Sequence, residues 1–385
     1  MQPFEFATAT RIVFGCCEAR QLAAAAAQMG SRALVVTGGS PGRVRPLIAN
    51  LEAAGIACAL FSTPSEPTID LIRAGAGYAR SEGCEVVVAI GGGSAIDTGK
   101  ALAALLSNPG DPLDYLEVIG RAQPLRHPST PLIAVPTTAG SGAEVTRNAV
   151  LASPEHRVKA SLRSPFLLPK LALIDPELTF DLPRAITAST GLDALTQLIE
   201  PYVSSRATAM TDLYCVDGLR RAADALPRVW EEGRDRAART SMSFASLLGG
   251  MALANAGLGV VHAFAAPVGG MWTAPHGAIC AAVLPHAIEV NVEALRSRAP
   301  ESPALCRYDE IARLLTRQPH AIADDAVLWI ADLCARLEIP PLRAYGVTAA
   351  DIPSLADKAA VTSSMKGNPI QLTAEELREI ALRAL

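Results

Sequence analysis

The sequence predicts an α/β fold with a parallel sheet in its amino-terminal half and an all-α fold in its carboxy-terminal half. In residues 1–175, short apolar runs that end at Gly, Pro, Ser or Asp alternate with amphipathic stretches, as in βαβ units. From Asp181 onward the chain consists of long segments rich in Ala, Leu and Arg with a 3.6-residue period. A chain of 385 residues is also long enough for more than one core. We therefore predict two domains, residues 1–180 and residues 181–385.

The individual elements are predicted from their local patterns. Apolar runs of four or five residues are the expected strands: 33–36, 57–61, 86–90, 132–135 and 171–174. The amphipathic stretches 44–54 and 68–81 are expected to be helices between these strands. The clearest expected helices of the second half are 212–229, 237–254 and 308–316.

Composition and charge exclude several classes of protein. Hydrophobic residues make up 50% of the chain and charged residues 19%, as in ordinary folded proteins. The 34 Lys and Arg against 38 Asp and Glu give a net charge of −4 without any block of like charges. This balance argues against nucleic acid or an anionic membrane as a partner. With 4% aromatic residues, a surface that stacks bases is not expected either.

Cysteine usage and one apolar stretch bear on the compartment. The eight cysteines are scattered without a CxxC pair, and the amino terminus does not resemble a secretory leader. These features predict reduced thiols in a cytoplasmic protein. The apolar stretch 247–272 contains six glycines and Pro267, so we interpret it as a close-packed helix buried inside the protein and not as a membrane span.

A glycine-rich turn follows the third expected strand. Gly92, Gly93 and Ser94 come at the end of the apolar run and open a helix-like stretch. Glycines let the backbone approach a ligand closely, and Ser94 is expected to cap the helix, so that free N–H groups would face a pyrophosphate. The motif is neither GxGxxG nor GxxxxGK[ST], and a turn that binds nothing is the alternative.

A second loop of this kind follows the fourth expected strand. Residues 136–144 offer the hydroxyl groups of Thr137 and Thr138 and two glycines. Because the carboxyl ends of parallel strands meet at one edge of a sheet, the two loops together predict a dinucleotide lying across that edge.

Four polar residues in the second half are candidate metal ligands. Asp193 and Gln197 are four residues apart, so both would project from one face of a helix, and His262 and His276 follow later. An Asp with two His is a ligand set for iron or zinc, to which Gln adds a weaker neutral oxygen. The alternatives are that the histidines are core residues, or that Gln197 hydrogen-bonds Asp193 or a histidine in a polar cluster without metal.

Together these motifs resemble the iron-containing (group III) alcohol dehydrogenase family. The resemblance runs nearly from end to end, through motifs at 11–15, 91–100, 136–144, 175–178, 191–200, 262–277 and 368–369. It implies a dehydroquinate synthase-like architecture, with an α/β dinucleotide-binding domain at 1–180 and a helical metal and substrate domain at 181–385. It further implies hydride transfer between NAD(P)(H) and a small alcohol, aldehyde or ketone, with Fe²⁺ or Zn²⁺ polarising the substrate oxygen.

Carried over residue by residue, the resemblance implies the site residues. The positions that match cofactor-binding residues are Gly92, Gly93, Ser94, Asp97, Thr137, Thr138 and Lys159. Asp193, His262 and His276 match three of the four metal ligands, and we expect both histidines to be catalytic. Gln197 stands where the family has its fourth ligand, a histidine, and Ala266 stands where the family has a histidine often proposed to relay protons.

Three alternatives follow from the two departures and from the architecture. A metal-independent reductase of the maleylacetate reductase type would use the imidazoles of His262 and His276 as hydrogen-bond or proton donors. A nucleotide-binding module without catalysis would explain Gln197 and Ala266. A synthase of the dehydroquinate synthase type would need clustered Lys and Arg for its substrate phosphonate, and residues 247–285 contain neither.

The residues after the first expected strand bear on the choice of cofactor. NAD-specific members resembling this chain carry Asp at the position of Gly38, where a carboxylate bonds the ribose 2′-hydroxyl and repels a 2′-phosphate. Ser40 could hydrogen-bond that phosphate, and Arg43 or Arg45 could supply positive charge. We therefore predict that NADP(H) is accepted, with NAD(H) as the alternative. The expected partners are a small-molecule substrate and a second copy of the chain in a homodimer.

Overall fold

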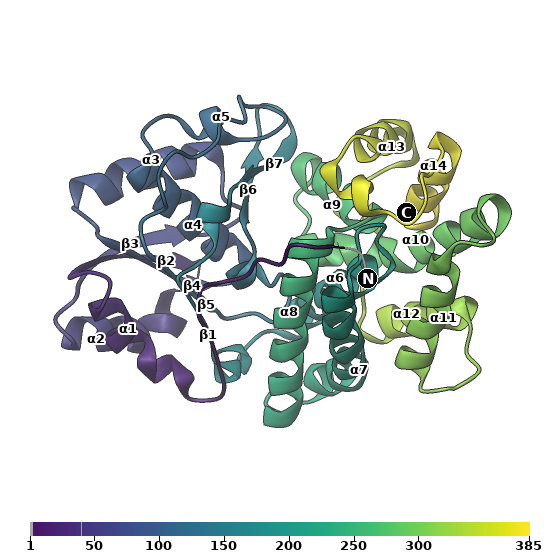
Figure 1. The fold of residues 1–385 in the computed structure, drawn as a ribbon, viewed down its shortest axis with the longest axis horizontal. Helices are drawn as coiled ribbons and strands as arrows, with labels where there is room; N and C mark the ends of the chain where they lie inside the picture. The colour runs from purple at the N-terminus through teal and green to yellow at the C-terminus, as the bar shows by residue number, and fades with distance from the viewer. Residues whose placement is uncertain (1–2, 40) are drawn as a thin grey trace. The chain divides into compact units, whose positions relative to one another are not determined.

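The computed structural model describes residues 3–39 and 41–385, which divide into two compact units (Figure 1). One unit, which we call the α/β unit, consists of Ala7–Thr138 and Gly142–Phe180. The other, the helical unit, consists of Asp181–Leu385 together with Ala139–Ser141 and residues 3–6. The loop after the fourth predicted strand is thus divided between the two units.

The α/β unit is built on a six-stranded parallel sheet in the order β1-β8-β5-β4-β2-β3 (Figure 1). Its strands are β1 (Ile12–Phe14), β2 (Arg32–Gly38), β3 (Ala57–Thr63), β4 (Val86–Gly91), β5 (Leu132–Pro136) and β8 (Leu171–Ile174). All five predicted strands are confirmed. β4, β5 and β8 are buried along their whole length, which explains why their sequences are continuous apolar runs without polar alternation.

Helices cover both faces of this sheet. Leu47 and Leu51 of α2 (Arg45–Ala53) pack with Val35 on one face, beside α1 (Leu22–Ala27). The other face is covered by α3 (Ile69–Ser81) and α4 (Gly93–Ser107), which pack with Leu34, Val36 and their neighbours. Successive strand residues point to opposite faces, so one strand supplies both cores. The predicted helices at 44–54 and 68–81 are confirmed as α2 and α3.

The edge strand β1 and three other short elements of the α/β unit were not predicted. The antiparallel pair β6 (Asn148–Ser153) and β7 (Val158–Arg163) forms a separate hairpin, and α5 (Pro112–Tyr115) is a single turn. The alternating burial along β6 is the signature of a strand with one buried face. Its sequence, Asn-Ala-Val-Leu-Ala-Ser, does not alternate polar and apolar residues in step with this burial, so no period-two pattern indicated the strand.

The helical unit consists of nine α-helices among the described residues, with short 3₁₀ turns. They are α6 (Arg184–Val203), α7 (Ala209–Glu231), α8 (Arg236–Ala256), α9 (Val260–Met271), α10 (His276–Arg298), α11 (Pro303–Thr316), α12 (Ala323–Arg336), α13 (Ile352–Ala360) and α14 (Ala374–Arg383). α6 is buried on every side from Gly191 to Val203, and α7, α8 and α10 pack around it. The α/β and all-α fold classes are thus both confirmed.

The stretch 247–272 is two helices and not the single buried helix that its sequence suggested. α8 ends at Ala256 and α9 begins at Val260, and the two helices are bent by 98° relative to each other. Gly257 between them has φ +74°, a conformation that favours glycine. Among the described residues α10 alone is a single helix long and apolar enough to cross a membrane, and 78% of that stretch is buried inside the protein.

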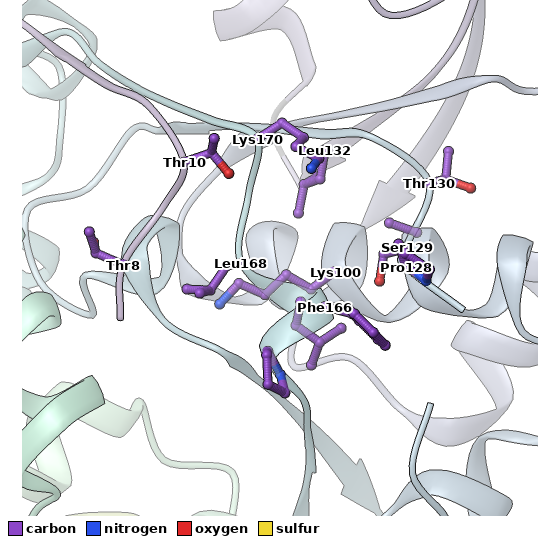
Figure 2. A pocket seen from close by; sticks show the side chains of 13 residues that line it. Thr8, Thr10, Lys100, Pro128, Ser129, Thr130, Leu132, Phe166, Leu168 and Lys170 are labelled. Carbon is purple, nitrogen blue, oxygen red and sulfur yellow. The ribbon is translucent and has the colours of Figure 1, made fainter. Parts of the chain in front are cut away.

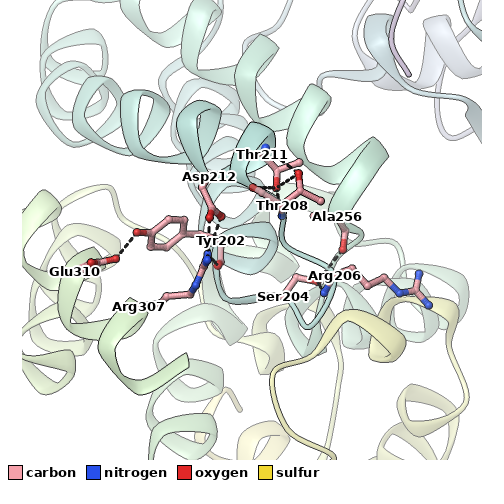
Figure 3. A network of polar contacts seen from close by, with 9 residues as sticks. All are labelled: Tyr202, Ser204, Arg206, Thr208, Thr211, Asp212, Ala256, Arg307 and Glu310. Atoms are coloured by element: carbon pink, nitrogen blue, oxygen red, sulfur yellow. Dashed lines mark hydrogen bonds and ion pairs between the residues drawn. The ribbon is translucent and has the colours of Figure 1, made fainter. Parts of the chain in front are cut away.

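A polar network fixes the carboxyl end of α6 (Figure 3). The guanidinium of Arg307 donates to both carboxylate oxygens of Asp212 at 2.6 and 2.8 Å and to the carbonyl oxygen of Tyr202 at 2.6 Å. The Tyr202 hydroxyl in turn hydrogen-bonds Glu310. These contacts join α6 to α7 and α11, so the helix that carries Asp193 and Gln197 is held at its end.

The α/β unit contains a cavity of about 150 Å³ (Figure 2), and none of the predicted cofactor residues lines it. Leu132 and Lys170, which lie at the amino ends of β5 and β8, line it together with Thr8, Thr10 and Lys100. In parallel α/β sheets, ligands bind at the carboxyl ends of the strands. This cavity is therefore at the opposite edge from a nucleotide site of the usual kind.

Candidate functional site

The glycine-rich turn and the second loop meet at one edge of the sheet. Gly38, Gly91 and Pro136 are the last residues of β2, β4 and β5, three neighbouring parallel strands. A Cβ atom added to Gly92 would lie 3.3 Å from Cγ2 of Thr138, so the two loops are in close contact. The backbone N–H of Thr137 donates to the carbonyl of Gly91 at 2.9 Å, which extends the pairing beyond the strands.

This edge also contains the point where the order of strands changes direction: the chain adds β3 on one side of β2 and then β4 on the other. β2 and β4 are neighbours, but β2 leads into α2 on one face of the sheet and β4 leads into α4 on the other. Connections that leave on opposite faces open a crevice at the carboxyl ends of the two strands, and α/β proteins bind their ligands in such crevices. Gly38 and Gly92 lie at that position.

Ser94 does not cap the helix, contrary to the sequence-based expectation. α4 begins at Gly93, its N-cap is Gly92, and within the described chain no side chain makes a capping hydrogen bond there. Ser94 lies inside the first turn, where its carbonyl accepts from the Thr98 hydroxyl at 2.8 Å. An uncapped first turn leaves backbone N–H groups for an anion, and the positive end of the helix dipole favours one.

Two other predicted cofactor residues, Asp97 and Lys159, contact residues outside the two loops. Asp97 accepts from the backbone N–H of Val150 at 3.0 Å and is 3.7 Å from the Lys100 ammonium. The Lys159 ammonium, 5% exposed, forms an ion pair of 3.2 Å with Glu66 in the loop after β3. Ser40 lies outside the described residues, so the prediction for it stays a prediction.

In the helical unit, α6, α9 and α10 bring the predicted metal residues together. His262 Nε2 is 3.4 Å from Asp193 Oδ1, and His276 Nε2 is 3.8 Å from the same oxygen. The two imidazole rings are 5.4 Å apart between centroids. Cys280 is the fourth member of this cluster: one ligand atom from each of these residues lies within 4.8 Å of all the others. We call Asp193, Gln197, His262, His276 and Cys280 the polar cluster.

Three atoms of the polar cluster are buried without a partner. Asp193 Oδ1, Gln197 Oε1 and His262 Nε2 make no hydrogen bond within the described part of the chain, and their residues are 4%, 3% and 6% exposed. An unpaired buried polar atom costs about 1–3 kcal/mol, so three on neighbouring residues are unusual unless something binds them. Carboxylate oxygen, imidazole nitrogen and thiolate sulfur are zinc and iron ligands, and the donor set therefore fits a divalent metal.

Glu200 holds His262 in a fixed orientation. Its carboxylate is 2.6 Å from His262 Nδ1 and accepts from the backbone N–H of Val261 at 2.7 Å, at the start of α9. With Nδ1 donating to a carboxylate, Nε2 faces the polar cluster and would present its lone pair to a bound metal, an arrangement typical of metal-ligating histidines. Burial acts to raise the pKa of Asp193, but His276 and His262 hold that pKa below its ordinary value. Asp193 therefore remains an anion.

Gly277 explains how α10 approaches α6 so closely. A Cβ atom at this position would lie 2.3 Å from the carbonyl oxygen of Ser189 and 3.2 Å from Cβ of Asp193. A larger residue would therefore push the start of α10 away from α6. The glycine that directly follows His276 thus lets that histidine and Cys280 reach Asp193.

Sequence reasoning missed Glu200 and Cys280. Glu200 is seven residues after Asp193, and Cys280 is four residues after His276. Both spacings place the residue on the same helix face as a predicted ligand. That spacing could have indicated the two residues in the sequence. It identifies them as site residues only when the packing of α6, α9 and α10 is known.

Comparisons with known proteins agree with the geometry of both units. Residues 9–176 match the family model "Iron-containing alcohol dehydrogenase", and residues 187–385 match "Fe-containing alcohol dehydrogenase family, C-terminal". The chain is 35% identical over 361 residues to alcohol dehydrogenase 4 of Saccharomyces cerevisiae, covering 92% of this chain and 91% of the relative.

Solved structures show the same similarity. A crystal structure of 1,3-propanediol oxidoreductase superposes with a TM-score of 0.92 at 33% identity and covers 100% of both chains. Sulfoacetaldehyde reductase from Bifidobacterium kashiwanohense, solved in complex with NAD⁺, superposes with a TM-score of 0.86 at 28% identity, covering 99% of this chain and 98% of that one.

Proposed function

Because the chain belongs to the iron-containing alcohol dehydrogenase family, we propose that it is an NAD(P)-dependent oxidoreductase that interconverts a small alcohol and its aldehyde or ketone. The observation that carries this proposal is the polar cluster, in which three neighbouring buried atoms lack partners among the described residues and are of the types that bind a divalent metal.

The α/β unit would hold the dinucleotide through its backbone. The N–H groups at the uncapped start of α4 would receive the pyrophosphate, and Gly92 and Gly93 would let it approach. Gly38 lies at the end of the neighbouring strand and Thr138 against Gly92, and we assign both to the same ligand. Asp97, Thr137 and Lys159 complete the proposed set of cofactor residues.

The helical unit would hold the metal through Asp193, His262 and His276, with Gln197 as a weaker neighbour. When bound, the nicotinamide supplies or accepts the hydride, and the metal, Fe²⁺ or Zn²⁺, polarises the substrate oxygen. The chain's own contribution is orientation: Glu200 prevents the His262 ring from turning, and burial of Asp193 keeps water from competing for its carboxylate.

His276 is the member of the polar cluster best placed to exchange a proton with substrate. Its side chain is 36% exposed, whereas the side chains of His262 and Asp193 are 5% and 6% exposed. This exposure favours the second candidate, a metal-independent reductase in which His276 donates a proton to the developing alkoxide. The two candidates differ in one measurement, the turnover that remains after a chelator has removed all metal.

We propose that NADP(H) is accepted as well as NAD(H). Position 38 is a glycine, and a Cβ there would meet no described atom within 4 Å, so no carboxylate excludes a 2′-phosphate. Arg43 and Arg45 are exposed near this strand end. A preference for NADH above roughly tenfold in kcat/KM, about 1.4 kcal/mol, would contradict this assignment.

The test of the nucleotide assignment is cofactor binding by Gly92→Val, measured by fluorescence titration with NADPH and NADH. We expect at least a hundredfold weaker binding, about 2.7 kcal/mol, because the added side chain fills the approach to the first turn of α4. Gly77→Val is the matched control, since a Cβ there meets no described atom within 4 Å. Unchanged affinity in Gly92→Val would remove these glycines from the site.

We also propose a cytoplasmic homodimer. All eight cysteines lie among the described residues and are free thiols, as a reducing compartment would leave them. A homodimer is the commonest assembly of soluble enzymes. Light scattering of the purified protein would contradict the second part of this proposal if it gave the mass of a single 40.1 kDa chain.

A further inference from the structure

Cys280 is the one residue of the polar cluster that no motif had indicated. It follows His276 by four residues on α10, so both side chains project from the same face of the helix. Cys280 is fully buried, and its Sγ lies 3.8 Å from His276 Nε2. Its side chain therefore points into the polar cluster and not into the apolar packing of α10.

The nitrogen–oxygen distances in the polar cluster are longer than ordinary hydrogen bonds and close to the ligand spacing around a shared ion. Metal–nitrogen bonds of about 2.0–2.1 Å and metal–sulfur bonds of about 2.3 Å place neighbouring ligand atoms of a tetrahedral site roughly 3.3–3.6 Å apart. The distances from Asp193 Oδ1 are 3.4 Å to His262 Nε2 and 3.8 Å to His276 Nε2. Cys280 Sγ is 3.8 Å from His276 Nε2, within hydrogen-bonding range for sulfur, and all four ligand atoms lie within 4.8 Å of one another. Hydrogen bonds between nitrogen and oxygen are normally 2.7–3.2 Å long.

Gln197 is a poor candidate for the fourth strong ligand. Its amide oxygen has no partner among the described residues and is a neutral ligand atom. A thiolate carries a full negative charge and is a preferred ligand of zinc. The polar cluster thus holds a stronger donor on α10 than the one that α6 offers at position 197.

We infer that Cys280 is a ligand of the divalent metal, taking the role that position 197 would have if it were a histidine. The inference rests on the proposed function, because it concerns the same metal. On binding, the thiol proton leaves to solvent and the sulfur forms the bond to the metal, with no change of oxidation state. The resulting donor set of two imidazoles, one carboxylate and one thiolate favours zinc over harder ions.

The test is the absorption spectrum of the full-length protein loaded with Co²⁺, which reports a thiolate ligand directly through a charge-transfer band in the near ultraviolet. We expect the band in the parent protein and its loss in Cys280→Ser. Cys215→Ala removes another fully buried cysteine of the helical unit and should keep the band. Chelator competition should show Zn²⁺ affinity at least tenfold weaker in Cys280→Ser, with a smaller loss for Mn²⁺.

A double variant separates loss of a ligand from damage to the fold. If Cys280 occupies the fourth position, Cys280→Ala combined with Gln197→His should regain Zn²⁺ affinity while its Co²⁺ form lacks the band. Co²⁺ bound without the band in the parent, or the band retained in Cys280→Ser, would overturn the inference. Absence of any Co²⁺ binding would overturn it too, whereas the proposed function is judged separately by NADPH oxidation with short aldehydes.

Discussion

The buried network around Lys100 in the α/β unit and the polar cluster of the helical unit differ in how many of their polar atoms have hydrogen-bond partners. In the α/β unit, Lys100 is fully buried and donates to Thr146 Oγ1 at 2.7 Å and to the Asn148 carbonyl at 2.9 Å. Asp97 supplies the opposite charge at 3.7 Å. In the polar cluster of the helical unit, by contrast, three buried atoms find no partner among the described residues.

This difference separates a structural network from a binding site. Buried polar atoms that satisfy one another stabilise one packing of the chain, and removing one leaves the others unpaired. Buried polar atoms left without partners cost free energy in the empty protein and are retained because a ligand completes them. Lys100 belongs to the first kind, although it ends the glycine-rich motif that we assign to the cofactor. The polar cluster belongs to the second kind.

The largest expected effect is a loss of stability when the buried network around Lys100 is disrupted. Lys100→Met keeps most of the side chain's volume but leaves Thr146 and Asn148 without a donor and removes the positive charge beside Asp97. We expect the free energy of unfolding, measured in urea, to fall by about 3–5 kcal/mol. Lys366→Met, at an exposed lysine, should change it by less than about 0.5 kcal/mol. Equal effects of the two substitutions would contradict the structural role.

The next prediction concerns the pH dependence of the same network. Burial raises the pKa of Glu144 to about 7. Between its ordinary pKa and this value the folded state binds more protons than the unfolded state, so stability falls as the pH rises through that range. The loss is about 3 kcal/mol for a shift of this size.

Glu144→Gln removes this titration and isolates its contribution. We expect the difference in unfolding free energy between the parent and Glu144→Gln to change in favour of the variant as the pH rises from about 5 to about 7. Urea denaturation at both pH values measures it. A constant difference across this range would show that the Glu144 carboxyl is not protonated in the folded state.

The sequence was sufficient to predict those features that depend on residues adjacent in the chain. The buried strands β4, β5 and β8 are apolar on both faces, so their runs stand out, and the turn at Gly92 is contiguous in the chain. The position of the N-cap was not predictable from residue type alone, because both Gly92 and Ser94 are acceptable caps. In the structure the N-cap is Gly92, and α4 begins at Gly93.

The polar cluster could be predicted only in part because its residues come from three helices. Asp193, His262 and His276 were singled out as residue types that bind metal, and the structure brings them together. Cys280 belongs to a residue type that is usually an inert buried thiol. Its approach to Asp193 depends on the contact that Gly277 permits between α10 and α6, which no local pattern encodes.

The smallest expected change in the free energy of unfolding is at Gln197 in the polar cluster. The test replaces this residue by Met, as at Lys100. Gln197→Met, in protein freed of metal by chelator, removes an amide that favours the Asp193 carboxylate but also removes a buried oxygen without a partner among the described residues. These two contributions are each about 1–2 kcal/mol and oppose one another, so we expect the unfolding free energy to change by less than about 1 kcal/mol. Urea denaturation of Gln197→Met beside Lys100→Met gives the comparison directly.

If Gln197→Met costs more than about 3 kcal/mol, the polar cluster is a stabilising network like that of Lys100, and its unpaired atoms do not mark a binding site. If the cost is small, the stability of the helical unit does not depend on residue 197, and that position is free to vary between an amide and an imidazole while Asp193, His262 and His276 remain.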